Sequence, residues 1–173
     1  MQWRNDRTVA KDPTAPTPYF LNAFFYANLW HQHKCAYHAL QRWTKNFDAV
    51  ATGKLFIPVN ECNTQGILVV VEKRAGTISL YDSLGARNQR VAERVRLWLV
   101  EEAEHYKTPQ REWPVEHAWC RFQENMDDCG VSKVENMNYI AQGLDLRTMK
   151  RSTSYYRRPI AAELLAKRIG AWG

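Results

Sequence analysis

A continuous apolar run, Ile67-Leu68-Val69-Val70-Val71, is the feature that most constrains how this chain can fold. Its short length and β-branched residues are typical of a strand buried on both faces at the centre of a sheet. The polar link 72–76 ends in glycine and predicts a hairpin to a second strand at 77–81. A third strand is predicted at 54–59, and its Pro58 favours a sheet edge or a strand end.

Several amphipathic or apolar segments are available to cover both faces of that sheet. Helices are predicted at 20–30, 36–47, 86–106 and from Cys129 to 142, and a last helix is predicted to open at Pro159 and end near residue 170. Residues 113–122 are predicted to be extended. We therefore expect one α+β domain over residues 19–173, preceded by a proline-containing N-terminal arm over residues 1–18.

Composition narrows the class of protein. The chain has 173 residues, 45% of them apolar, with a formal net charge of +6. These are globular values, no apolar run is long enough for a membrane span, and the first residues lack the apolar core of a secretory signal. Four cysteines at spacings that match no common zinc site predict free thiols, no metal, and a reducing compartment, the nucleus or cytoplasm. The positive charge favours an acidic partner, and we expect a monomer that does not bind membranes.

Cys129 stands where a polar loop turns into a predicted helix. Free backbone N–H groups and the positive end of the helix dipole stabilise a thiolate at such a position. Gly130 leaves the approach to the sulfur open, and Gln123 is close enough in sequence to donate to an oxyanion. The alternative is a structural cysteine in a helix start that is capped by Asp128.

Asp82 is a second candidate, at the end of the predicted strand 77–81. A carboxylate at that place often orients a catalytic base, and it is also an ordinary turn-forming residue before the next helix.

Six short motifs follow one another along residues 20–142. They are Leu21-Asn22-Ala23-Phe24-Phe25-Tyr26-Ala27-Asn28-Leu29, Arg42-Trp43-Thr44-Lys45, Phe56-Ile57-Pro58-Val59-Asn60, Leu68-Val69-Val70-Val71, Tyr81-Asp82-Ser83-Leu84 and the stretch from Gln123 to Gly130. In order and spacing they resemble the ubiquitin-like-protein proteases, the SUMO-specific cysteine peptidases related to the adenovirus protease. The upstream stretch Trp3-Arg4-Asn5-Asp6 is similar to the W-L-N-D motif of that family, with Arg in place of Leu.

The resemblance implies a papain-like cysteine proteinase fold with a central, mostly antiparallel sheet flanked by helices. It implies a Cys–His–Asp triad in which Cys129 is the nucleophile and Asp82 the orienting carboxylate, with Gln123 as the oxyanion donor. The implied reaction is hydrolysis after the C-terminal Gly-Gly of SUMO or another ubiquitin-like protein, in deconjugation or precursor maturation, without a cofactor. Gly66, Gly130 and Trp3 fall where the family binds the Gly-Gly tail.

The chain departs from the family at the position of the catalytic histidine. The family has His-Trp after the Asn of the strand motif, and the count from Asn60 places Gln65 and Gly66 there. The interval of 17 residues from Gln65 to Asp82 matches the family, so the register is sound. Since the chain has no histidine between His38 and His105, no local shift restores one.

Glutamine can keep the geometry of this position but cannot take up a proton. Loss of one triad member costs about 10³- to 10⁶-fold in rate. Three accounts remain open: a natural pseudoprotease that still binds its modifier, a chain inactivated or redesigned on purpose, and a divergent enzyme that recruits another base, for which His117 is the candidate. Restoring both residues by Gln65→His with Gly66→Trp is predicted to raise hydrolysis about tenfold or more.

Two further features carry alternatives. Lys133 stands one turn into a helix that is normally buried, and it predicts a rearranged core or a side chain that runs along apolar surface. A basic stretch with two tyrosines favours, as a second alternative to a protease or pseudoprotease, a nucleic-acid-binding domain, although an acidic ubiquitin-like partner explains the charge equally well. That stretch comprises Arg147, Lys150, Arg151, Tyr155, Tyr156, Arg157 and Arg158.

Overall fold

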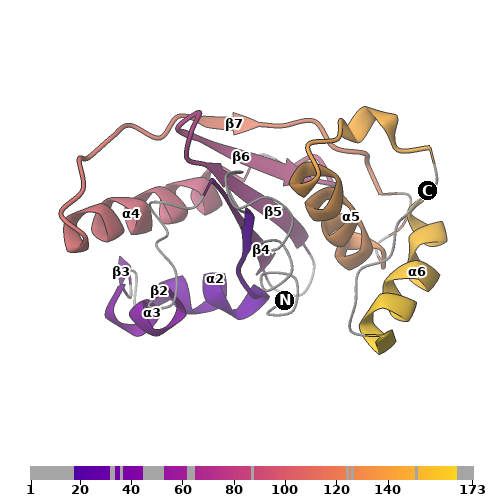
Figure 1. Cartoon of the computed structure of the whole chain (residues 1–173), viewed down its shortest axis with the longest axis horizontal. Coiled ribbons are helices and arrows are strands. Elements are labelled where there is room, and N and C mark those ends of the chain that lie inside the picture. Colours follow the sequence, from indigo (N-terminus) through magenta and orange to yellow (C-terminus); the bar gives the residue numbers. More distant parts are fainter. Residues whose placement is uncertain are drawn as a thin grey trace.

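A computed structural model describes residues 18–31, 34–35, 37–44, 53–61, 65–86, 88–123, 125, 127–150 and 152–166. Helices lie on both faces of a five-stranded sheet (Figure 1). The strands of this sheet, in spatial order, are β1 (Pro18–Phe20), β4 (Lys54–Glu61), β5 (Gln65–Glu72), β6 (Thr77–Asp82) and β7 (Val115–His117). The helices are α2 (Ala23–Leu29), α3 (Tyr37–Thr44), α4 (Gln89–His105), α5 (Cys129–Ala141), the 3₁₀ turn η1 (Leu146–Thr148) and α6 (Thr153–Ala166). A separate two-stranded pair is formed by β2 (Trp30–His31) and β3 (Lys34–Cys35).

The apolar run 67–71 forms the middle of β5, and β5 is the central strand of the sheet, as predicted. It pairs antiparallel with β4 and β6 along long ladders, whereas β1 and β7 add short parallel ladders at the two edges. Pro58 pairs with Leu68 on one side, but the ladder of β1 ends at Phe56. β4 is therefore not an edge strand and Pro58 is not at its end, contrary to the expectation. Because β1 does not reach Pro58, the missing N–H of the proline still costs no ladder hydrogen bond.

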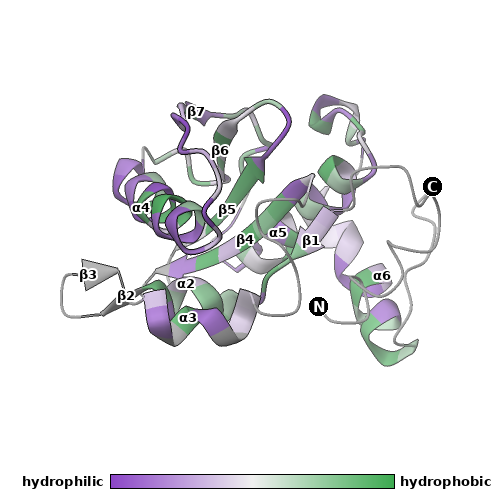
Figure 2. Ribbon diagram, turned by 60° about the vertical axis from the view of Figure 1, so that its left-hand side comes forward, coloured by the Kyte–Doolittle hydropathy of each residue, from purple (hydrophilic) through white to green (hydrophobic). Residues whose placement is uncertain are grey.

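Alternation along the strands divides the core between the two faces of the sheet. Val69 and Val71 of β5 belong to a cluster with Trp98 of α4, while Leu68 and Val70 pack with Met137 of α5 in a second cluster. Figure 2 shows apolar residues running along the central strands and polar residues on the outer side of α4. A strand that is buried on both faces needs such a cover on each side.

The turn between β5 and β6 and the end of α5 have the glycines that sequence reasoning assigned to them. Gly76 has φ +73° and its N–H donates to Glu72 O at 2.7 Å, while Gly143 has φ +72° just after α5. Other residues are strained at these φ values, so both glycines are required by the backbone.

Two predicted boundaries were wrong. Phe20 lies in β1, not in the first helix, because residues 18–20 pair with β4. The last helix begins at Thr153 and contains Pro159, so Pro159 does not open it. The cost of an internal proline is offset by packing, since Tyr156 and Thr153 are buried and α6 lies against α5. Residues 1–17 and 167–173 lie outside the described part of the chain, so the boundary between arm and domain stays a prediction.

Candidate active site

Cys129 is the first residue of α5 and a half-buried free thiol. Asp128 stands at the N-cap position, but its side chain makes no capping hydrogen bond to α5. Its carboxylate turns away instead, and it accepts from Arg157 Nε and from Asn125 Nδ2 at 2.7 Å each. Since the Asp128 side chain does not accept from them, the N–H groups of the first turn keep their partial positive charge at the helix end where Cys129 stands. The Asp128 side chain thus does not cap α5 in the way the structural alternative expects.

Gly66 of β5 lies directly under the start of α5. A Cβ atom placed on Gly66 would be 2.9 Å from Cys129 Cβ and 3.2 Å from Cys129 O. Real Cβ atoms do not make contacts that short, so only glycine allows Cys129 to pack this closely on the sheet. At Gly130, in contrast, an added Cβ would meet nothing within 4 Å.

Asp82 is buried at the end of β6, and both oxygens of its carboxylate are occupied. Oδ1 accepts from the Leu84 backbone N–H at 2.9 Å, and Oδ2 accepts from Asn88 Nδ2 at 2.7 Å. These donors fix the orientation of the carboxylate. In the sheet Asp82 pairs with Ile67, which stands two residues after Gln65 at the start of β5. The backbone thus brings position 65 to the strand next to Asp82; the side chain of Gln65, like Trp3, lies outside the described residues.

Gln123 is tied to the residue after Asp82. Its Oε1 accepts from Ser83 Oγ at 2.6 Å, its backbone N–H donates to Ser83 O at 3.1 Å, and its Nε2 donates to Asn125 O at 2.7 Å. Since an amide Nε2 carries two hydrogens, one N–H remains for an oxyanion. Asn125 in turn bonds Asp128, so a continuous network links the loop after β6 to the helix start at Cys129.

Sequence reasoning missed four members of this network: Asn88, Ser83, Asn125 and Arg157. Asn88 is the one with a readable signal, because a polar residue directly before an amphipathic helix is a typical N-cap. It occupies that position of α4, but its amide is turned toward Asp82. Arg157 could not have been found from local sequence, since it reaches Asp128 from a different helix.

His117, the candidate replacement base, lies exposed in β7 and pairs with Leu80 in the sheet. It lines a cavity of about 170 Å³ whose wall also includes Asp82. The hydrogen bonds of the Asp82 carboxylate come from Leu84 and Asn88 and not from His117.

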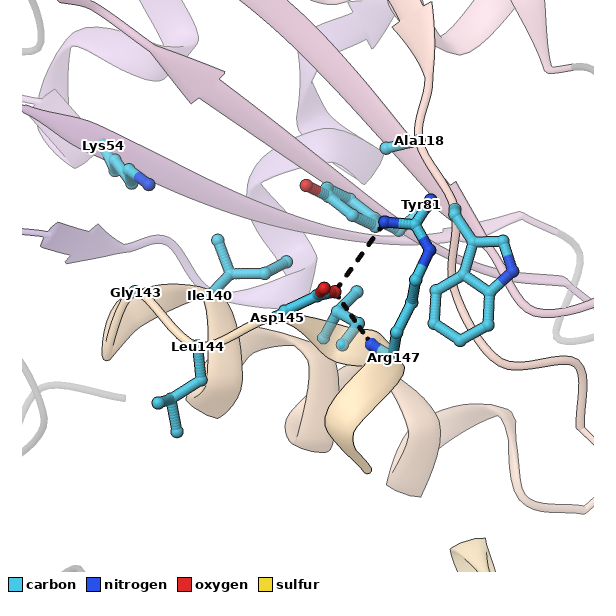
Figure 3. Close-up of a pocket in the computed structure, with 10 residues that line it drawn as sticks. Lys54, Tyr81, Ala118, Ile140, Gly143, Leu144, Asp145 and Arg147 are labelled. Carbon is cyan, nitrogen blue, oxygen red and sulfur yellow. Dashed lines mark hydrogen bonds and ion pairs between the residues drawn. The ribbon is translucent and has the colours of Figure 1, made fainter. Parts of the chain in front are cut away.

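A cavity of about 380 Å³ opens beside α5, with Lys54, Tyr81 and Arg147 in its wall (Figure 3). Asp145 holds Arg147 there, accepting from its backbone N–H at 2.9 Å and pairing with its guanidinium at 3.9 Å. None of the candidate catalytic residues lines this cavity. Within the described residues, no group of three His, Cys, Asp or Glu side chains is placed to hold a metal ion, and no helix has the length and apolar character to cross a membrane.

The basic stretch does not form a continuous free surface. Tyr156 is buried, Arg157 is engaged with Asp128, and Arg147 stacks over Trp119 as well as pairing with Asp145. Arg151 lies outside the described residues. These contacts disfavour the nucleic-acid alternative, because Tyr156, Arg157 and Arg147 already have partners within the fold, although Lys150, Tyr155 and Arg158 are exposed.

Comparison with known proteins identifies the family. The Ulp1 protease family, C-terminal catalytic domain, matches residues 2–169. The chain belongs to the Ulp1 protease family. The resemblance read from the six motifs is thereby confirmed.

Individual members of the Ulp1 family agree with this assignment. A sentrin-specific protease of Caenorhabditis elegans is 26% identical over 162 residues, covering 91% of this chain and 23% of the relative. SUMO protease Ulp1 with its catalytic cysteine oxidised to a sulfonic acid superposes with a TM-score of 0.77 at 24% identity, covering 95% of this chain and 83% of that one. The Ulp1 protease domain in complex with Smt3, the yeast ortholog of SUMO, gives 0.75 at 25% identity, with coverage of 88% and 70%.

The structural likeness confirms the predicted fold class, an α+β fold with a sheet flanked by helices. The chain spans only 23% to 29% of the length of the first curated relatives. The family model that it matches describes a C-terminal catalytic domain.

Proposed function

We propose that this chain is a thiol-dependent protease domain that acts after the C-terminal Gly-Gly of a SUMO-type modifier, and that Gln65 impairs its turnover. Membership of the Ulp1 family supports the reaction class. The structure of a related domain with Smt3 supports a SUMO-type substrate, and the charge of +6 suits an acidic partner. A thiol nucleophile must stay reduced, so we place its action in the nucleus or cytoplasm.

The observation that carries the proposal is the hydrogen-bond network joining Asp82, Gln123 and the start of α5. Ser83 Oγ holds Gln123 Oε1 at 2.6 Å, so the amide nitrogen is directed away from Ser83 with one N–H unused. Asn125 links the same amide to Asp128, the residue before Cys129. Such preorganised donors are what an acyl-transfer site needs, because they stabilise the oxyanion without rearranging.

In the proposed reaction the Cys129 thiolate attacks the carbonyl carbon of the terminal glycine. The C–N bond to the lysine or peptide amine then breaks, and water hydrolyses the acyl-enzyme thioester. The leaving amine needs a proton, and an imidazole at position 65 would deliver it. A glutamine amide does not release a proton in the working pH range. Gln65 is therefore expected to slow the departure of the amine more than any other step.

The test is hydrolysis of fluorogenic C-terminal derivatives of SUMO, NEDD8 and ubiquitin, with Cys129→Ala as the control. We expect slow turnover of the SUMO derivative that disappears in Cys129→Ala. Turnover that survives Cys129→Ala would refute Cys129 as the nucleophile.

A second candidate function, binding without cleavage, is favoured specifically by Gln65. In that case the folded chain gives no turnover of any derivative, while Cys129→Ala retains the affinity for SUMO because the larger contact surface lies outside the tail. The hydrolysis assay separates the two functions, since a protease and a pseudoprotease both bind SUMO but only the first cleaves. Isothermal titration with unmodified SUMO checks the binding that both functions require. Absence of both binding and cleavage would contradict both candidates.

A further inference from the structure

Lys133 stands one helical turn after Cys129 on the same face of α5. Residues four apart on a helix are neighbours, so the two side chains emerge side by side. The Lys133 side chain crosses from α5 to the sheet, where Nζ donates to Val59 O of β4 at 3.2 Å. This is the residue that the sequence marks as unusual for a buried helix, and the structure shows it reaching inward to the backbone of β4.

Gly66 brings Lys133 and Cys129 to one point. The Cβ position of Gly66 is 2.9 Å from Lys133 Cε and 2.9 Å from Cys129 Cβ. The aliphatic end of the lysine and the base of the cysteine therefore converge over the glycine. A side chain at position 66 would occupy the space that both of them use.

Among the described residues, the neighbouring carboxylates leave the Lys133 cation without another close partner. Asp128 is neutralised by Arg157, and Asp127 is exposed. Glu135 lies two residues beyond Lys133, about 200° around the helix, where its neighbours are Arg121 and Asp128. Burial lowers the pKa of Lys133, and attraction to a thiolate at Cys129 counteracts this shift. The charge-bearing end of Lys133 thus lies beside the side chain of Cys129.

We propose that Lys133 is a positioning residue that holds Cys129 as the thiolate, a task that the family assigns to the histidine absent here. The inference rests on the proposed role of Cys129 as the nucleophile. The thiol proton leaves to solvent, the ammonium keeps its own protons, and the charges of the two groups balance. Lys133 supplies no proton to the leaving amine, because its Nζ is held on Val59 O.

One consequence concerns the substrate class. With a thiolate formed but no acid to protonate an amine, the site favours substrates whose leaving group departs as a stable anion or thiolate. Activated esters and thioesters of the modifier C-terminus fit this requirement better than isopeptides do.

The experiment measures the rate of Cys129 alkylation by iodoacetamide from pH 5 to pH 9, with mass spectrometry of the peptide that contains it. Lys133→Gln retains a donor for Val59 O but has no charge, and Lys133→Arg retains the charge. Lys150→Met, an exposed lysine outside the site, is the control. Because only the thiolate reacts, the pH midpoint of alkylation reports how strongly the site favours that form.

We expect Lys133→Gln to move the midpoint upward by about one pH unit and to slow alkylation at pH 7 about tenfold. Lys133→Arg should keep most of the wild-type profile, and Lys150→Met should not change it. An unchanged profile in Lys133→Gln would overturn the inference. Because alkylation needs no substrate, a shifted profile in a chain that cleaves nothing would keep this inference and reject the proposed proteolysis.

Discussion

Arg157 of α6 donates through Nε to the carboxylate of Asp128 at 2.7 Å, and Asp128 is the residue directly before Cys129. The carboxylate is almost completely buried, with 3% of the Asp128 side chain exposed, while 51% of the Arg157 side chain is exposed. This ion pair therefore fastens α6 to the start of α5. In this way a segment remote in sequence contributes to the position of the candidate nucleophile.

Replacing Arg157 by Met should destabilise the fold by about 1–3 kcal/mol, because it leaves a buried carboxylate without its cation. The half-exposed guanidinium keeps the effect below that of a fully buried pair. The free energy of unfolding, measured in urea, checks this expectation.

Arg158→Met is the matched control for that change. Arg158 is the exposed neighbour in α6 and should change stability by less than about 0.5 kcal/mol. Equal effects of the two substitutions would show that the ion pair with Asp128 contributes nothing.

Ser83→Ala should reduce hydrolysis by the Gln65→His variant about tenfold. Without Ser83 Oγ, the Gln123 amide loses the donor that orients it, and its free N–H no longer points at the oxyanion. The reduction should appear in kcat with little change in KM, because the donor acts mainly in the transition state.

Ser79→Ala serves as the comparison for Ser83→Ala. Ser79 is also a buried serine of the same strand region, but it donates to Glu116 and not to Gln123. If Ser79→Ala reduces hydrolysis as much as Ser83→Ala does, the loss comes from a general disturbance of β6 and not from the orientation of Gln123.

The buried Glu135 should make stability depend on pH. Burial raises the pKa of Glu135 from 4.5 to about 8, and the negative charge of Asp128 acts in the same direction while Arg121 opposes it. A carboxyl with a raised pKa in the folded state binds its proton more tightly than in the unfolded chain. Its stabilising contribution is therefore complete below about pH 4.5 and is lost as the pH rises toward about 8.

Glu135→Gln should remove that part of the pH dependence. The thermal midpoint of the variant should exceed that of the wild type at pH 8 by a few degrees, and the difference should shrink at pH 5. Glu102, whose pKa is also raised by burial, is present in both proteins and cancels in the comparison. A constant difference across this range would contradict a raised pKa at Glu135.

Cys129 should react with iodoacetamide much faster than Cys120 at pH 7.5. Cys120 is buried, and burial raises the pKa of its thiol to about 11, whereas Cys129 lies half-exposed at a helix start. Peptide mass spectrometry after brief labelling measures both in one sample. Faster labelling of Cys120 would be incompatible with Cys129 as the nucleophile.

Much of the fold was readable because its strongest patterns are local. The apolar run 67–71, the glycine-ended turn before β6 and the periodicity of α4 each identify an element from a short window. Pro159 misled the prediction for the opposite reason. Whether a helix tolerates proline depends on the packing of residues such as Tyr156 against α5, and that packing is not visible in the local sequence.

The sequence predicted which residues belong to the candidate site better than it predicted how they are held. Cys129, Asp82 and Gln123 carry motif signals, but their partners come from distant parts of the chain: Ser83 is 40 residues from Gln123, and Arg157 is 29 from Asp128. The sequence also suggested restoring tryptophan at position 66. The 2.9 Å approach of Cys129 Cβ to that position shows that any side chain there must displace the cysteine.

The most direct measurement is therefore the hydrolysis of a fluorogenic SUMO C-terminal derivative by Gln65→His alone, with Gly66 retained. We expect an increase of about tenfold or more over the wild type, because the imidazole supplies the proton that the leaving group needs. That increase should vanish in Gln65→His with Cys129→Ala. No increase in a folded Gln65→His variant would contradict the claim that position 65 limits this site.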